Sequence, residues 1–277
     1  MKYLKNKIVA FVFFILLLAQ ASIPSFASAE KSVRVFSSVL ATGYDIQVKL
    51  EENRYWFRMG DNEWVLLKGD VLQGGKAVEV LFMDVNDNKI NDVFVKLFEV
   101  GANSLYALFI TTINDGGVLF SEHGEVFGSP YLNNQGALIS VKHDGPFSKI
   151  EKFYGDGDVF YRSELREAIN SDLERVIIYD KRGKTGFSIN FLGTNITAGA
   201  CVISERAYLS RGPSSAEVTK AYFVKGDRLV VLDSTSDAEW LKVRYRGKIV
   251  TEAWVSQEML RFNIDDQCGE NMLNFSS

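Results

Sequence analysis

Nine residues, DVNDNKIND at positions 84–92, place oxygen-bearing side chains at alternate positions between two apolar segments. Asp84, Asn86, Asn88 and Asp92 stand at loop positions 1, 3, 5 and 9, and the carbonyl of Ile90 adds another oxygen. A hard cation such as Ca²⁺ takes roughly six to eight oxygens at about 2.3–2.6 Å. The spacing predicts a calcium site, and the alternative is a metal-free turn held by side-chain to backbone hydrogen bonds.

An EF-hand is excluded as the type of calcium loop. Its twelfth position needs a bidentate Glu but is Val95, and the following DVFVKLF has a strand pattern rather than a helical one. The loop resembles the D-x-[DN]-x-[DN]-G-x-x-D loops of calcium-binding propeller repeats, with Lys89 in the place of the usual Gly. That position requires a positive φ, which is costly for Lys. With only two charged ligands, we expect a dissociation constant of about 10⁻⁴ to 10⁻³ M.

Catalytic patterns are weak in this chain. The two histidines, His123 and His143, lie outside any H-E-x-x-H spacing, and no Ser has a nucleophile-elbow context. Asp156 and Asp158 could suggest glycoside hydrolysis, but GDGD between strand patterns predicts a hairpin turn first. Neither GxGxxG nor a Walker sequence is present. We therefore expect no enzymatic activity.

The N-terminus predicts export. A basic start, an apolar stretch at residues 8–18 and small residues at Ala27 and Ala29 are typical of a signal peptide covering residues 1–29. The whole chain has 31 Lys and Arg against 35 Asp and Glu, so removing the three lysines of this segment gives a net charge of −7. Such a protein repels phosphate backbones, which disfavours nucleic acid as a partner and favours a cationic protein. We expect a periplasmic protein with no membrane span after cleavage.

Two cysteines, Cys201 and Cys268, are the whole complement of the chain. In an oxidising compartment they predict one disulfide that closes the C-terminal region, and two free thiols are the alternative.

Between Val33 and Phe191 the sequence repeats short apolar-alternating runs separated by Gly, Asp and Asn. Runs such as YDIQVKL, AVEVLFM and ERVIIYD read as strands at period two, and connectors such as MGDN at 59–62 supply tight-turn residues. The pattern predicts an all-β, antiparallel meander, either propeller-like or a sandwich. SELREAINSDLE, at 163–174, is the one stretch that could be helical.

TNITAGA, at 194–200, is a polar, small-residue stretch, and we expect a boundary there between domains at 30–197 and 198–277. Beyond it, ERAYLSRGPS, AYFVKGDRLVVL, WLKVRY and AWVSQEML resemble the exported bacterial SH3 family over about residues 201–262, with Ala253 where the family usually has Gly. The resemblance implies a small SH3-like β-barrel. Inward positions are expected at Val224, Leu229, Val231, Leu241, Val243, Val255 and Leu260.

The aromatic residues of this segment have two interpretations. Tyr208, Tyr222, Trp240 and Trp254 either line a surface groove or, for Tyr222 and Trp254 in particular, fill the core. In some members of the bacterial SH3 family such a groove binds peptide stems of the cell wall, so the resemblance implies peptidoglycan as a ligand.

FMDVNDNKINDVFVKLF and, more faintly, the segment from Gly136 to Ile169 resemble periplasmic proteins with one calcium loop in a propeller-like β domain, over about residues 78–182. Some members of that family inhibit lysozyme or act as immunity proteins against secreted peptidoglycan hydrolases. The resemblance implies a non-enzymatic inhibitor or immunity protein, with HDGPFSK and YGDGDVFY as candidate protruding loops. The alternative is a peptidoglycan-binding or envelope adaptor protein that uses its SH3 domain.

Overall fold

The computed structural model describes residues 33–39, 45–52, 54–68, 79–114, 117–156, 159–262 and Cys268. The described part is all-β and its sheets are antiparallel, as the sequence predicts, with two short 3₁₀ turns at Ser215–Glu217 and Gln257–Met259. None of the helical segments in these ranges is long and apolar enough to cross a membrane. The predicted signal peptide, residues 1–29, lies outside the described residues.

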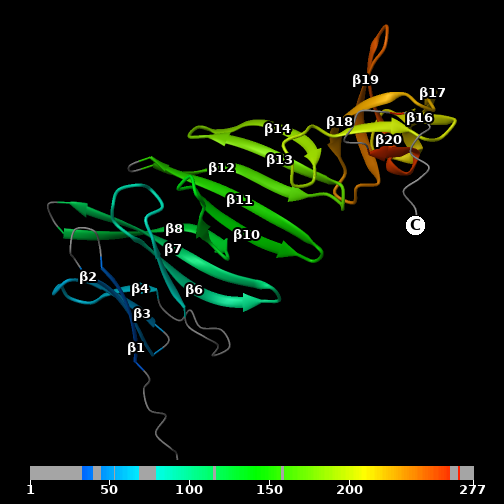
Figure 1. The fold of residues 1–277 in the computed structure, drawn as a ribbon. Coiled ribbons are helices and arrows are strands. Elements are labelled where there is room, and N and C mark those ends of the chain that lie inside the picture. The colour runs from blue at the N-terminus through cyan, green and yellow to red at the C-terminus, as the bar shows by residue number, and fades with distance from the viewer. Residues whose placement is uncertain are drawn as a thin grey trace, which may run out of the picture.

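Three meanders follow one another along the chain (Figure 1). The first contains β1 (Arg34–Val39), β2 (Asp45–Glu51), β3 (Arg54–Met59) and β4 (Val65–Lys68). The second contains β5 (Val80–Met83), β6 (Asp92–Val100), β7 (Asn103–Asn114) and β8 (Gly117–Gly128). The third contains β9 (Tyr131–Leu132), β10 (Leu138–Asp144), β11 (Phe147–Asp156), β12 (Val159–Ala168), β13 (Leu173–Asp180) and β14 (Gly183–Phe191).

The second sheet is the middle layer of this part of the fold. On β6, Val93 and Val95 pack against the first sheet, whereas Phe94 packs with Leu138 and Phe153 of the third sheet. Because both faces of the strand are covered, six consecutive residues from Asp92 to Leu97 are buried. Each meander therefore completes the core of the next one.

The fourth sheet curls around its own core at the C-terminal end (Figure 1). Its strands are β15 (Gly199–Val202), β16 (Arg206–Ser210), β17 (Val218–Val224), β18 (Arg228–Ser234), β19 (Trp240–Arg246), β20 (Val250–Ser256) and β21 (Leu260–Phe262), in the spatial order β17-β16-β20-β19-β18-β15-β21. Six of the seven expected inward positions are buried. The expectation was wrong at Val224, which is 47% exposed because its neighbour Phe223 takes the inward position.

The core of the fourth sheet continues into the end of the third. Leu173, Ile189 and Phe191, from β13 and β14, belong to the same buried cluster as Leu229 and Val255.

The segment expected to form a domain boundary is itself ordered. Ala198 is fully buried, its amide donates to the carbonyl of Ile189 at 2.9 Å, and its carbonyl accepts from the amide of Val231 at 2.9 Å. The backbone therefore joins β14 directly to the last sheet.

The helix considered for residues 163–174 was wrong. Residues 163–168 belong to β12 and residues 173–174 to β13, joined by a turn in which Asn170 accepts from the amides of Asp172 and Leu173. Glu, Leu, Arg and Ala favour helices locally, but pairing with β11 on one side and β13 on the other decides the conformation. Tertiary context overrides the local preference here.

The disulfide predicted from the sequence is confirmed. Cys201 of β15 is bonded to Cys268, 67 residues further along the chain, with 5.6 Å between their Cα atoms. The bond ties Cys268, beyond β21, to β15, the strand that lies between β18 and the edge strand β21 in the last sheet.

Candidate functional site

The loop at 84–92 folds around its own oxygen atoms. The carboxylate of Asp84 accepts from the amides of Asn88 at 3.2 Å and Lys89 at 2.9 Å. The amide oxygen of Asn86 accepts from the Asn88 amide at 3.4 Å, and that of Asn88 accepts from the Ile90 amide at 2.8 Å. Side chains at alternate positions therefore point to the inside of the loop, as the spacing predicts.

Asp92 closes the loop from its last position. Its side chain is fully buried and accepts from the amides of Val85 at 3.0 Å and Thr111 at 2.7 Å. Burial raises the pKa of Asp92 to about 7; the two amides act in the opposite direction, and the nearby carboxylate of Asp84 adds to the rise. Asn88 donates to the carbonyl of Thr111 at 2.9 Å, so β7 holds the loop at its middle through Asn88 and at its last position through Asp92.

The backbone of the loop has the positive φ that was expected at Lys89, where the calcium loops it resembles have glycine. Lys89 has φ 66° and Asp87 has φ 58°, so both lie in the left-handed region. Their side chains form an exposed ion pair. Opposite the loop stands Gly155 of β11, where a Cβ atom would lie 2.0 Å from the Cα of Asn86. A glycine is therefore required at 155 for the loop to pack on the third sheet.

The chemistry of this donor set fits a hard cation. Carboxylates of Asp84 and Asp92, amide oxygens of Asn86 and Asn88 and the Ile90 carbonyl are all oxygen donors. A carboxylate has about four lone-pair sites, so oxygens that accept one amide can still accept a cation. Across the described ranges no group of three or more His, Cys, Asp or Glu could hold a metal ion. The donor set of the 84–92 loop has two such side chains, Asp84 and Asp92, and its other two side chains are amides. The same side-chain to backbone hydrogen bonds would also hold the loop as a turn without a metal ion.

The aromatic residues of the C-terminal sheet lie on its outer face. Tyr208 on β16 faces Tyr222 on β17, with ring centroids 5.9 Å apart, and the two are 39% and 41% exposed. The guanidinium of Arg206 lies 4.7 Å from the Tyr222 ring. Their neighbours Ala207 and Phe223 take the buried positions, so Tyr222 is not a core residue.

Trp240 and Trp254 are half-buried and lie on this same outer face. Trp254 on β20 is opposite Lys242, and Trp240 on β19 is opposite Ser256, while Leu241 and Val255 point into the core. Arg206, Tyr208, Tyr222, Trp240 and Trp254 are called the outer aromatic face below.

The two histidines are in different environments. The ring of His123 lies 4.9 Å from that of Phe160 and 5.6 Å from that of Phe127, and its Nδ1 is buried without a hydrogen-bond partner. Burial lowers the pKa of His123; the Glu125 carboxylate opposes the change and the Arg162 cation adds to it. His123 is therefore packed between aromatic rings as a neutral residue.

His143 sits on the exposed β10–β11 hairpin, within the HDGPFSK segment. Its Nδ1 lies 3.0 Å from the hydroxyl of Ser148, its register partner, and its backbone exchanges hydrogen bonds with the side chain of Asn103. Cross-strand pairing alone brings this Ser and His together. The other candidate loop, YGDGDVFY, includes Asp158 and Gly157, which lie outside the described residues.

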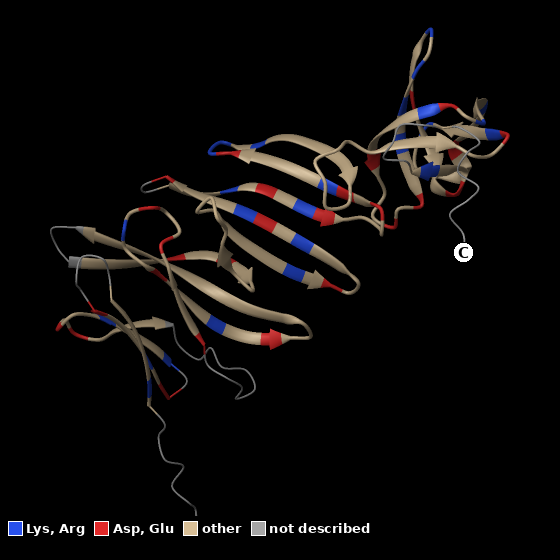
Figure 2. Cartoon of the chain, in the orientation of Figure 1, with Lys and Arg blue, Asp and Glu red and all other residues tan. Residues whose placement is uncertain are grey.

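Two polar networks were not anticipated from the sequence. Glu151 is 1% exposed and binds Lys142 at 2.7 Å and Arg162 at 2.9 Å, on the face of the third sheet that meets the second. Figure 2 shows the alternation of basic and acidic residues along β11 and β12.

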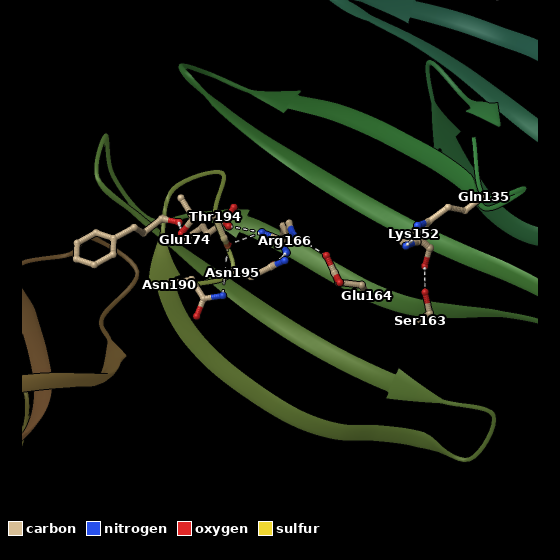
Figure 3. Close-up of polar contacts among 10 residues, drawn as sticks. Gln135, Lys152, Ser163, Glu164, Arg166, Glu174, Asn190, Thr194 and Asn195 are labelled. Carbon is tan, nitrogen blue, oxygen red and sulfur yellow. Dashed lines mark hydrogen bonds and ion pairs between the residues drawn. The ribbon is translucent and has the colours of Figure 1, made fainter. Parts of the chain in front are cut away.

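On the opposite face of the same sheet, Arg166 lies between Glu164 and Glu174 (Figure 3). Its guanidinium also donates to the Thr194 carbonyl at 2.9 Å and to the side chain of Asn195. The network attaches the turn that leads to β15. The sequence carries no local signal for this network, because Arg166 and Asn195 are 29 residues apart.

Comparisons with protein-family models, with curated proteins and with solved structures found no match to this chain. The bacterial SH3 module and the lysozyme-inhibitor-like β domain therefore remain predictions from sequence motifs.

Proposed function

We propose that this chain is an exported, non-catalytic inhibitor or immunity protein that binds a peptidoglycan-degrading enzyme through the outer aromatic face. The observation that carries the proposal is the exposed Tyr208–Tyr222 pair with Arg206 stacked beside it. Tyr, Trp and Arg are the side chains that most often dominate binding energy at protein interfaces, and the aromatic ones offer large contact areas at low entropic cost. A strand-built sheet holds them in place before binding.

Net charge supports a cationic enzyme as the partner. A mature chain at −7 attracts positively charged proteins and speeds their encounter, and salt screens that attraction. Association should therefore slow as ionic strength rises, while the dissociation rate, set by the aromatic contacts, should change little.

We further propose that the 84–92 loop binds Ca²⁺ through Asp84, Asn86, Asn88, Asp92 and the Ile90 carbonyl. The cation would neutralise the buried Asp92 carboxylate and hold the loop against Gly155. Its role is structural, since the loop lies between the second and third sheets. Calorimetric titration of the mature protein tests the site, and the absence of both heat and a rise in melting temperature at millimolar Ca²⁺ would leave only the turn.

Inhibition of wall hydrolysis tests the main proposal. The mature protein is added to a panel of lysozyme-type muramidases and secreted amidases acting on purified sacculi, and the rate of solubilisation is measured. The double variant Tyr208→Ala/Tyr222→Ala should lose inhibition by roughly tenfold or more, as expected when a pair of interface anchors is truncated. Tyr131→Ala is the matched control, because Tyr131 is 51% exposed on another sheet. If the wild-type protein slows none of the enzymes, the proposal fails.

Direct binding to the wall is the second candidate, and the same exposed rings favour it because aromatic faces provide flat, amphipathic surfaces for a ligand. In this case the whole mature protein sediments with purified sacculi when no hydrolase is present, and Tyr208→Ala/Tyr222→Ala stays in the supernatant. Inhibition without sedimentation supports the inhibitor, and sedimentation without inhibition supports the wall-binding adaptor.

A further inference from the structure

A groove of about 820 Å³ opens where the β14–β15 connection meets β18 and β19. It shares no residue with the outer aromatic face. Its lining comes from both sides of the β14–β15 turn and from the fourth sheet, and comprises Phe191, Ile196, Thr197, Ala198, Gly199, Gly226, Asp227, Arg228, Leu229, Val230, Arg244, Tyr245 and Arg246. Ligand sites commonly have volumes of about 300–1,000 Å³.

The floor of the groove is apolar and fixed. Phe191, Ala198 and Leu229 belong to the shared core of the third and fourth sheets and are at most 5% exposed. Ile196, 50% exposed, stands among the lining residues as an accessible apolar side chain. An apolar ligand group placed here would cover surface that water now contacts.

The lining on the β18–β19 side is basic. Leu229 of β18 pairs with Tyr245 of β19, so Arg228 and Arg246, one residue further on, stand side by side across the two strands. Both are exposed, and neither has an ion-pair partner among the described residues. Like charges that face each other across strands are destabilising. An anion between them would remove that repulsion.

Nearby acidic groups do not neutralise this pair. Glu252 is bound to Arg244, at 2.8 Å and 2.7 Å to two guanidinium nitrogens. Asp227 accepts from the amide of Val224 at 2.9 Å and forms no ion pair with Arg228 or Arg246 among the described residues. The chain as a whole has more acidic than basic residues, and the groove is therefore a local basic site on an acidic protein.

We propose that the groove binds a short extended peptide that carries a carboxylate next to an apolar side chain. Arg228 and Arg246 bind the carboxylate through charge-assisted hydrogen bonds, and the apolar side chain contacts the exposed Ile196 and the half-buried Val230, which lies on the same face of β18 as Arg228. The apolar floor selects such a peptide over a simple anion, which would use the arginines alone.

Fluorescence anisotropy with three labelled pentapeptides tests the proposal. The sequences are Ser-Glu-Leu-Glu-Ser, its charge-free counterpart Ser-Gln-Leu-Gln-Ser and its apolar-free counterpart Ser-Glu-Ser-Glu-Ser. The first should bind the whole mature protein at least roughly tenfold more tightly than either counterpart, with an affinity that falls as salt rises.

Matched variants locate the binding. Arg228→Gln/Arg246→Gln should lose roughly tenfold or more in affinity for the Glu-Leu peptide, whereas Arg34→Gln/Arg182→Gln, which removes two exposed arginines elsewhere, should not. The melting temperature of the first variant should stay level or rise, because like-charge repulsion is removed. Tyr208→Ala/Tyr222→Ala should bind the peptide normally, so the groove and the proposed function can fail independently.

Three results would overturn the proposal: no binding of the Glu-Leu peptide at millimolar protein, equal affinity for the Glu-Ser peptide, or equal affinity of the two arginine double variants. Displacement of the peptide by an equal concentration of inorganic phosphate would also overturn it, because the site would then select charge alone.

Discussion

Replacing Asp92 with Asn should change how the stability of the metal-free protein depends on pH. Burial raises the pKa of this carboxyl from 3.8 to about 7 in the folded state. Between these values the folded protein holds a proton that the unfolded chain has lost. The resulting stabilisation is complete below pH 3.8. It decreases by about 1.4 kcal/mol per pH unit as pH rises from 3.8 towards 7, and it is lost once pH has risen through 7.

From pH 5 to pH 8 the free energy of unfolding of the wild-type protein should therefore fall by about 3 kcal/mol relative to that of Asp92→Asn. For a chain of this size, that difference corresponds to roughly 6 to 12 °C in melting temperature. The comparison with the variant is essential, because His123 contributes with the opposite sign in the same range. Other titrating groups are present in both proteins and cancel.

The assay is denaturant unfolding in EDTA at pH 5, 6, 7 and 8, repeated at saturating Ca²⁺. A cation competes with the proton for the carboxylate, so Ca²⁺ should stabilise the wild-type protein more at pH 8 than at pH 5. Asp87→Asn is the matched control, since its carboxylate lies in the same loop but is 80% exposed. A constant difference between wild type and Asp92→Asn across the EDTA series, within about 0.5 kcal/mol, would refute the burial argument.

Four further changes have defined outcomes. His123→Phe should gain stability relative to the wild type as pH falls through 6.5, because burial lowers the folded-state pKa of this histidine and the unfolded chain gains the proton first; the difference between the melting curves of the two proteins from pH 5 to 7.5 measures it. Glu151→Ala should cost about 3 kcal/mol in denaturant unfolding, since two cations lose their shared buried partner. Reducing Cys201–Cys268 should cost about 4 kcal/mol, measured with and without reductant. Gly155→Ala should weaken calcium binding in calorimetry although Gly155 supplies no ligand itself, because its Cβ would overlap the backbone of the ligand residue Asn86.

For the three substitutions, a specific result would contradict the prediction. A difference in stability between His123→Phe and the wild type that stays constant with pH would place the titrating group elsewhere. A Glu151→Ala protein as stable as the wild type would show that the ion network adds nothing. Unchanged calcium affinity in Gly155→Ala would mean that the loop adjusts independently of β11.

The fold class and the conformation of the 84–92 loop were predictable because local spacing determines both. Alternating apolar residues specify strands. In the loop, oxygen-bearing side chains at alternate positions accept hydrogen bonds from the backbone amides of the same loop, as the spacing indicated. The positive φ at Lys89 followed from its place where related loops have glycine. These features depend on neighbours along the chain.

Other features could not be predicted, because they depend on which segments pair as strands and on which face of a strand each residue occupies. Nothing in the residues around 163–174 indicates that β11 and β13 pair on both sides of β12, so strong helix formers were misleading. The contact of Arg166 with Asn195 and the pairing that places Arg228 beside Arg246 join elements whose adjacency is set by topology. Exposure of Tyr222 followed from the inward turn of Phe223, a choice between two neighbours that the pattern left open.

Leu173, Ile189 and Phe191 have a practical consequence for anyone who divides this chain into fragments. A cut at residue 198 would separate these three side chains from the strands of the last sheet and expose an apolar patch on each fragment. Fragments of that kind would tend to associate with one another or with unrelated proteins. A pull-down performed with them would report binding to the newly exposed apolar contact surface rather than to the native surface. A C-terminal fragment that begins before β13 keeps these three side chains packed against the core of the last sheet.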